Sequence, residues 1–214
     1  MPLTMPEEIL LLTLDDEGRP VGVPAPALDL AVAGAVLMEL ALHGRVDSDP
    51  DRLYLASRTP TGDPLLDDVL ARIASDRDRD SRWWMERLSK DAAAFRSAFL
   101  DRLVVRGVLR RVQGRVLWFL NERRYPVLDG TQMQEVRARL RAVLLSGEIP
   151  DPRDALTIGL CQATGLVTLI LSDDERTAAT ARIAAVASLE EMGRSLSAAT
   201  RDLYAAMTAY GASP

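Results

Sequence analysis

The longest apolar stretch of the chain runs from Leu28 to Leu42, and only Asp29 and Glu39 are charged among its 15 residues. Apolar side chains occur on every face of such a helix, so neighbouring elements must cover it on all sides. As a helix it spans roughly 22 Å, whereas a bilayer span needs roughly 20 apolar residues. The pattern therefore predicts a buried central helix around which the other helices pack.

A second uncharged stretch runs from Ala155 to Leu171 and has 17 residues. It contains several threonines and a glutamine, and it lacks the aromatic residues that anchor a membrane helix at the interface. We therefore expect a second core helix, broken at Gly165. Cys161 lies inside this stretch and is expected to be an inert packing residue.

Amphipathic periodicity and capping residues predict further helices along the chain. The expected N-caps are Thr4, with Glu7 reaching back to it, Asp63, Ser81 and Thr131, and further helices are expected to start near Asp91, Asp151 and Asp173. The helix near Asp91–Arg106 places Phe95, Phe99 and Leu103 on one side and stops at Gly107. Residues 46–56 have apolar positions between polar stretches, which predicts a short strand or hairpin.

The hydrophobic period changes beyond Gly107. The run VLRRV, a turn at Gln113-Gly114 and the run RVLWFL predict a β-hairpin of β-branched and aromatic residues. Together, the elements predict a mainly α, single-domain helical bundle around a buried central helix, with a projecting β-hairpin. The domain is expected to cover residues 4–210, and residues 211–214 are expected to fray.

Charge is distributed unevenly, although the net charge of −5 and the 48% of hydrophobic residues describe an ordinary globular protein. Between Arg102 and Arg124 there are seven arginines and only one acidic residue, Glu122, which makes this segment +6. Such segregation builds a positive face that attracts anions, and the planar guanidinium suits phosphate oxygens. A solvated hairpin, whose arginine stems cover apolar neighbours, explains the same residues equally well.

Catalytic chemistry finds little support in the residue pattern. His43 is the single histidine and Cys161 the single cysteine, and no zinc-ligand spacing or glycine-rich nucleotide loop occurs. We therefore expect a protein that is not an enzyme and that has no catalytic residues, metal or cofactor. One cysteine excludes an internal disulfide framework, and the first residues do not resemble a secretory signal, so a cytoplasmic location is expected.

Five stretches taken in order resemble the Golgi phosphoprotein 3 family: PEEILLLTLDDEGR, GAVLMELALHGRV, PTGDPLLDDVL, DRLVVRGVL and RRYPV. The resemblance extends from about Thr4 to about Leu189. It implies a single mostly helical domain with a hairpin on the membrane-facing side. It also implies a peripheral membrane adaptor, because eukaryotic members bind phosphatidylinositol 4-phosphate at the Golgi and hold the tails of glycosyltransferases.

The pocket that binds the lipid headgroup in this family is matched at one of its four positions. The family has a tryptophan before the central helix, an arginine within it, and two arginines three residues apart on the helix before the hairpin. By spacing, these positions fall on Pro24, Ala33, Ala93 and Arg96. One guanidinium supplies charge without the enclosure that selects a headgroup, so specific recognition of phosphatidylinositol 4-phosphate is not expected.

A less specific mechanism is expected in its place, in which a basic face approaches an anionic membrane surface. Its expected lipid-binding residues are Arg96, Arg102, Arg106, Arg110, Arg111 and Arg115. Val116, Trp118 and Phe119 of the hairpin are expected to contact either the membrane or a second copy of the chain. Protein clients are a further expectation, as is a cytoplasmic, peripherally membrane-associated location.

The alternative function is nucleic-acid binding, because a helix followed by a basic hairpin also suits a duplex backbone. A recognition helix presents arginine, asparagine or glutamine to the bases. Here, the helix before the hairpin has phenylalanine and leucine at its periodic positions. Nucleic-acid binding therefore ranks below membrane binding.

Overall fold

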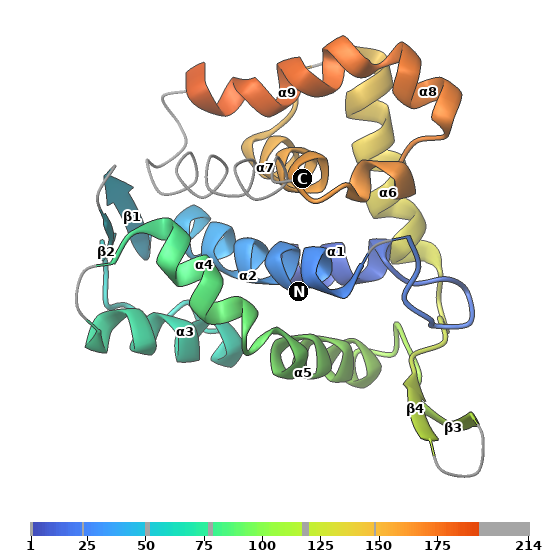
Figure 1. Ribbon diagram of the computed structural model, residues 1–214, viewed down its shortest axis with the longest axis horizontal. Helices are drawn as coiled ribbons and strands as arrows, with labels where there is room; N and C mark the ends of the chain where they lie inside the picture. Colours follow the sequence, from blue (N-terminus) through green and yellow to red (C-terminus); the bar gives the residue numbers. More distant parts are fainter. Residues whose placement is uncertain are drawn as a thin grey trace.

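The computed structural model describes residues 2–22, 24–49, 52–76, 79–116, 120–147 and 149–192, and this part of the chain is mostly helical (Figure 1). The helices are α1 (Met5–Leu12), α2 (Ala25–Leu42), α3 (Pro64–Ser75), α4 (Ser81–Ser89), α5 (Ala92–Val105), α6 (Thr131–Ser146), α7 (Pro152–Ala163), η1 (Leu166–Leu169), α8 (Asp173–Ala178) and α9 (Thr180–Met192). The same described residues contain two antiparallel hairpins, β1 (Val46–Asp49) with β2 (Arg52–Leu55) and β3 (Val112–Val116) with β4 (Leu120–Arg124).

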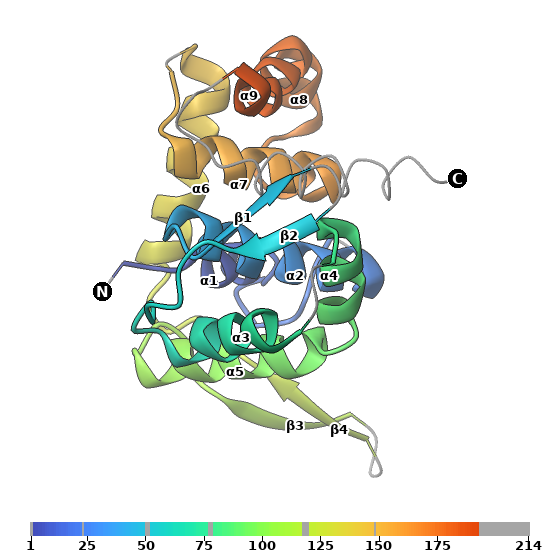
Figure 2. The same cartoon turned by 90° about the vertical axis from the view of Figure 1, so that its left-hand side faces the viewer.

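Helix α2 is the centre of the molecule, as its apolar pattern predicts. It contacts α1, α3, α4, α5 and α7, and its residues from Ala31 to Ala41 are buried. Figures 1 and 2 show α1 and α2 as a middle layer between α3–α5 on one side and α6–α9 on the other. By length and composition α2 is apolar enough to cross a membrane, but 67% of that window is buried by the surrounding helices. The contacts therefore identify α2 as a core helix.

The second uncharged stretch forms a broken core element, as predicted. Helix α7 ends at Ala163, Gly165 adopts a left-handed conformation with φ of 76°, and the 3-10 helix η1 follows. Cys161 is fully buried, and burial raises the pKa of its thiol far above the ordinary value. The uncharged thiol packs as an apolar side chain.

Capping residues start some helices as expected and others one residue away. Asp63 caps α3 and Asp151 caps α7, each by accepting a hydrogen bond from a backbone N–H of the first turn. The predicted caps of α4 and α6 are wrong. Asp80 caps α4 in place of Ser81, because its carboxylate accepts from Trp83 N at 2.6 Å. Helix α6 begins at Thr131 itself, after Gly130.

The predicted projecting hairpin is present, but its predicted turn is wrong. Gln113 and Gly114 lie within β3, where they pair with Arg123 and Glu122. Continuing the strands past Gly114 gives both of them further ladder hydrogen bonds, which a turn at that point forgoes. The connection, residues 117–119, lies outside the described residues, as does the predicted tail 211–214. Figures 1 and 2 show the hairpin extending away from the helical body beside the end of α5.

The base of this hairpin is fixed to the loop that follows α1. Tyr125 N donates to Gly18 O at 3.2 Å, and Arg110 N donates to Pro126 O at 2.9 Å. Gly18 has φ of +72°, and a Cβ atom there would lie 2.0 Å from the backbone carbon of Tyr125. Only glycine permits this close approach of two backbones. The hairpin therefore has a defined attachment to the body.

Candidate functional site

Two of the predicted lipid-binding arginines turn toward the N-terminal helix. Arg102 Nε donates to Glu7 Oε1 at 2.8 Å, and Arg106 Nη1 lies 3.1 Å from Glu7 Oε2. The Glu7 side chain is fully buried, and it also accepts from Thr4 N at 2.8 Å, as the predicted capping interaction requires. These guanidinium groups therefore neutralise a buried carboxylate, which reduces their contribution to a positive surface.

Arg102 has further contacts that hold it in place. Its Nη1 donates to Asp63 Oδ2 at 2.5 Å, and its guanidinium carbon lies 4.9 Å from the centre of the Phe99 ring. Burial alone would lower the pKa of Arg102, but the hydrogen bonds to Asp63 and Glu7 raise it above the ordinary value. Arg102 thus links α1, the start of α3 and α5.

A second ion-pair group lies on the other side of α1. Glu8 Oε1 accepts from Arg139 Nη2 at 2.9 Å, and Arg139 Nε is 2.8 Å from Asp154 Oδ1. Arg153 contacts Glu39 of the central helix at 2.9 Å. We call the two groups together the α1 ion-pair network: Glu7, Glu8, Glu39, Asp63, Asp154, Arg102, Arg106, Arg139 and Arg153. It joins α1 to α2, α3, α5, α6 and α7.

The ion pairs of the acidic members of this network were not predicted from the sequence. Glu7, Glu8 and Glu39 lie in the PEEILLL and GAVLMELAL stretches, which are among those that resemble the family. In the structure these buried glutamates form ion pairs that hold the fold together. A signal was present, because an acid within an all-apolar helix must be buried and then needs a cationic partner. The identity of those partners depended on the packing of distant helices.

Arg96, the matched position of the family's headgroup pocket, is also engaged. It forms an ion pair with Asp29 of α2, and both side chains are about one quarter exposed. Ala33 is fully buried in the core, whereas Pro24 and Ala93 are exposed. The four positions therefore offer one guanidinium, already paired, and no further cationic group.

The base of the hairpin carries the remaining described arginines together with apolar side chains. Arg110 is exposed and forms no ion pair with the described residues, while Arg111 pairs with Asp101. Val105 is 87% exposed and Leu128 is 59% exposed, and Leu128 N donates to Val108 O just beyond the end of α5. We call Val105, Arg110, Arg111 and Leu128 the hairpin-base surface.

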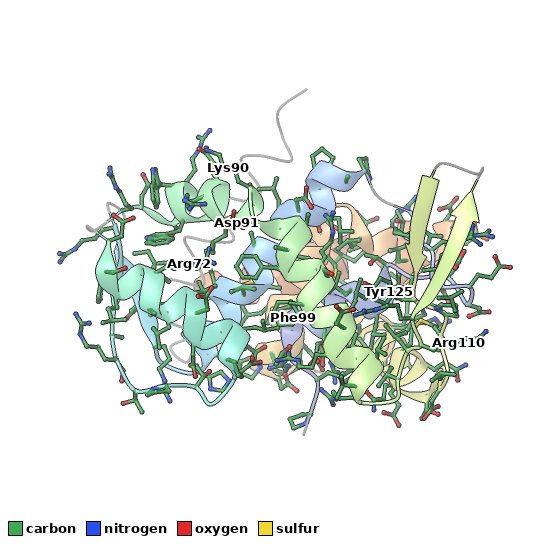
Figure 3. The ribbon with its side chains drawn as sticks, turned by 90° about the horizontal axis from the view of Figure 1, so that it is seen from below. Arg72, Lys90, Asp91, Phe99, Arg110 and Tyr125 are labelled. Carbon is green, nitrogen blue, oxygen red and sulfur yellow. The ribbon has the colours of Figure 1, made fainter. Side chains whose placement is uncertain are left out.

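Figure 3 shows the same face from below, with α5 crossing between α3 and α4 on one side and the hairpin on the other. Arg110 lies at the hairpin end, and Lys90 lies toward the opposite end. Arg72 of α3 is paired with Asp68 and Asp91. Exposed positive charge on this face is therefore interrupted by carboxylates.

The structure does not describe the side chains of the outer hairpin. Arg115 and Val116 belong to β3, but their side chains lie outside the described set, and Trp118 and Phe119 lie outside it entirely. Their contact with a membrane or with a second copy stays a prediction. Among the described residues no group of three or more histidine, cysteine, aspartate or glutamate side chains is placed to hold a metal ion.

Comparison with known proteins adds a family relationship to this geometry. Residues 5–207 match the family model described as Golgi phosphoprotein 3 (GPP34). Vacuolar protein sorting-associated protein 74 of Eremothecium gossypii is 26% identical over 164 residues, which cover 67% of this chain and 49% of that protein. The protein of the same name from Schizosaccharomyces pombe is 26% identical over 165 residues, with the same two coverages. The chain spans about half the length of these curated relatives.

Proposed function

Because the chain belongs to the Golgi phosphoprotein 3 family, we propose that it is a non-enzymatic peripheral membrane adaptor that binds anionic lipid through the hairpin-base surface. The observation that carries the proposal is the coincidence of a projecting hairpin, an exposed Arg110 and two exposed apolar side chains at one end of the molecule. A cytoplasmic location at a membrane surface follows from this proposal.

The combination of charge and apolar surface suits a membrane interface. Each arginine close to an anionic leaflet contributes about 1 kcal/mol, and the contribution decreases with salt. Arg111 shares its charge with Asp101, so its contribution is smaller than that of Arg110. Val105 and Leu128 add apolar area that enters the interfacial region. Binding is therefore expected to be weak and sensitive to salt.

Headgroup selection is expected to be slight. A pocket that selects phosphatidylinositol 4-phosphate needs several donors around one phosphate group. Arg96 is paired with Asp29, and buried Ala33 has no donor to offer. The proposed binding therefore follows the charge density of the membrane and not the identity of the phosphorylated headgroup.

Nucleic-acid binding is the second candidate, and the placement of α5 gives it little support. The phenylalanines of this helix, Phe95 and Phe99, are buried in the core, and its exposed residues include Ala93, Ala94 and Val105. Reading of base edges requires polar side chains on the exposed face of a helix. Membrane binding therefore remains the preferred proposal.

Co-sedimentation with vesicles tests the proposal. We expect enrichment on vesicles of phosphatidylcholine with phosphatidylglycerol over phosphatidylcholine alone at low salt, and loss of that enrichment at high salt. Arg110→Glu should weaken binding, whereas Arg58→Glu, the same change at an exposed position in the loop before α3, should weaken it less. Vesicles with phosphatidylinositol 4-phosphate, matched in total charge, should bind equally well.

A second pair of variants tests the contribution of apolar side chains to membrane binding. Val105→Ser should reduce vesicle binding with little change in Tm, because the side chain is 87% exposed. Leu145→Ser, at an exposed position near the end of α6, serves as the control. Absence of enrichment on anionic vesicles at low salt would reject membrane binding. Equal effects of Arg110→Glu and Arg58→Glu would reject the proposed surface.

A further inference from the structure

A cavity of about 340 Å³ lies where the N-terminal segment meets α5, α6 and α7. Its lining includes Leu3, Glu8, Arg106, Gln132, Arg139 and Arg153. The cavity is separate from the hairpin-base surface, since it shares none of that surface's residues. Its volume is at the lower end of the range for small-molecule pockets, which suits a ligand of amino-acid size.

Two residues of this lining have a buried acceptor atom without a hydrogen-bond partner among the described residues. Glu8 is 3% exposed, and its Oε2 atom has no such partner, although Oε1 accepts from Arg139. The Oε1 atom of the half-buried Gln132 also has none. A buried acceptor without a donor is unfavourable, and such atoms are rare in folded proteins. Both atoms can accept hydrogen bonds from a bound molecule that brings donors.

Donors for an anionic group come from the other side of the lining. A guanidinium has five N–H donors, and the contacts of Arg139 with the described residues use its Nε and Nη2 atoms. Arg106, the residue after α5, and Arg153 of α7 bring two more guanidinium groups to the same cavity, and both also pair with carboxylates, Glu7 and Glu39. A ligand carboxylate or phosphate would share these three cationic groups with the protein's own carboxylates.

The cavity lining carries charges of both signs. Glu8 and Glu135 bring two carboxylates, and Arg106, Arg139 and Arg153 bring three guanidinium groups. Burial raises the pKa of Glu8, although Arg139 and Arg153 act to lower it. A ligand with both charges would place an ammonium group beside the Glu8 carboxylate and an anionic group beside the arginines.

We propose that this cavity binds a small soluble zwitterion, whose ammonium group donates to Glu8 and Gln132 while its anionic group contacts the arginines. The ammonium satisfies the two unpartnered acceptors, and the anion uses the guanidinium donors. A ligand with only one of these groups leaves the other half of the cavity unmatched. Both charges on one small molecule are therefore the recognised feature.

Isothermal titration calorimetry on the full chain tests the proposal with soluble probes. β-Alanine and phosphoethanolamine carry both groups, propionate and inorganic phosphate carry the anion, and ethylamine carries the cation. We expect at least one zwitterion to bind about tenfold more tightly than either of its halves, since one lost charged hydrogen bond has roughly that effect. Equal binding of propionate or phosphate would overturn the assignment, as would no heat from any probe at about 10 mM.

Gln132→Ala tests the location without disturbing the α1 ion-pair network. It should weaken zwitterion binding about tenfold. Gln134→Ala is the matched control, because Gln134 is exposed on the same helix and does not line the cavity. Equal affinities in the two variants would overturn the location. Displacement of phosphoethanolamine by phosphatidylethanolamine vesicles would overturn the assignment to a soluble ligand. Vesicle binding by the hairpin-base surface is measured separately, so failure of either proposal is recognised independently.

Discussion

The substitution Glu7→Gln isolates the charge at the centre of the α1 ion-pair network. Glu7 is fully buried, and its two oxygens face the guanidinium groups of Arg102 and Arg106. Glutamine keeps the shape of the side chain and one acceptor oxygen. It removes the negative charge that neutralises the two guanidinium groups. The variant should fold to the same structure with a lower free energy of unfolding.

The magnitude follows from burial and from the contacts that remain. Removing one partner of a buried ion pair costs about 3–5 kcal/mol. Arg102 keeps Asp63, and both arginine side chains are about one quarter exposed, so the lower end, about 3 kcal/mol, is expected. For a domain of this size each kcal/mol lowers Tm by about 2–4 °C. Glu7→Gln should therefore lower Tm by about 6–12 °C.

Thermal unfolding followed by circular dichroism measures this difference. Glu17→Gln is the matched control, because Glu17 is 65% exposed and pairs with Arg19 at the surface. Such a surface pair contributes about 0–1 kcal/mol. If both variants shifted Tm by the same small amount, the network would not stabilise the fold and the reasoning would be refuted.

Two further predictions concern the same fold. Burial raises the pKa of Glu8 above its ordinary value of 4.5. The folded state therefore retains the proton to higher pH than the unfolded state does. The contribution of Glu8 to stability falls as pH rises above about 4.5. The Tm of the wild type minus the Tm of Glu8→Gln should therefore decrease from pH 4 to pH 7. A constant difference would contradict this sign. Gly18→Ala should lower Tm far more than Gly44→Ala, since both glycines have positive φ but only Gly18 faces the Tyr125 backbone; similar Tm values would contradict the close approach.

Helix positions followed from local rules that act within a few residues. The apolar run of α2 predicted its central place, and Asp63 and Asp151 marked the starts of their helices. The turn at Gln113-Gly114 was wrong for a tertiary reason, because strand pairing extends beyond it. Local turn propensity competes with ladder hydrogen bonds, and the ladder prevailed here.

The candidate site was less predictable than the fold, as Arg102 and Arg110 illustrate. Both belong to one run of arginines, and the sequence alone assigns them the same role. In the structure Arg102 is held by Glu7 and Asp63, whereas Arg110 is exposed at the hairpin base. The cavity at Glu8 and Gln132 had no sequence signal, because its lining comes from four separate segments.

The amino-acid sequence by itself determined the helices, the buried centre and the resemblance to a family, because periodicity and capping depend on neighbours along the chain. Only the tertiary structure decided which charges meet. Arg102 and Glu7 are 95 positions apart, and their contact exists because α5 packs beside α1. Ion pairing depends on distances of a few ångströms between helices, and those distances are set by the packing of the whole core.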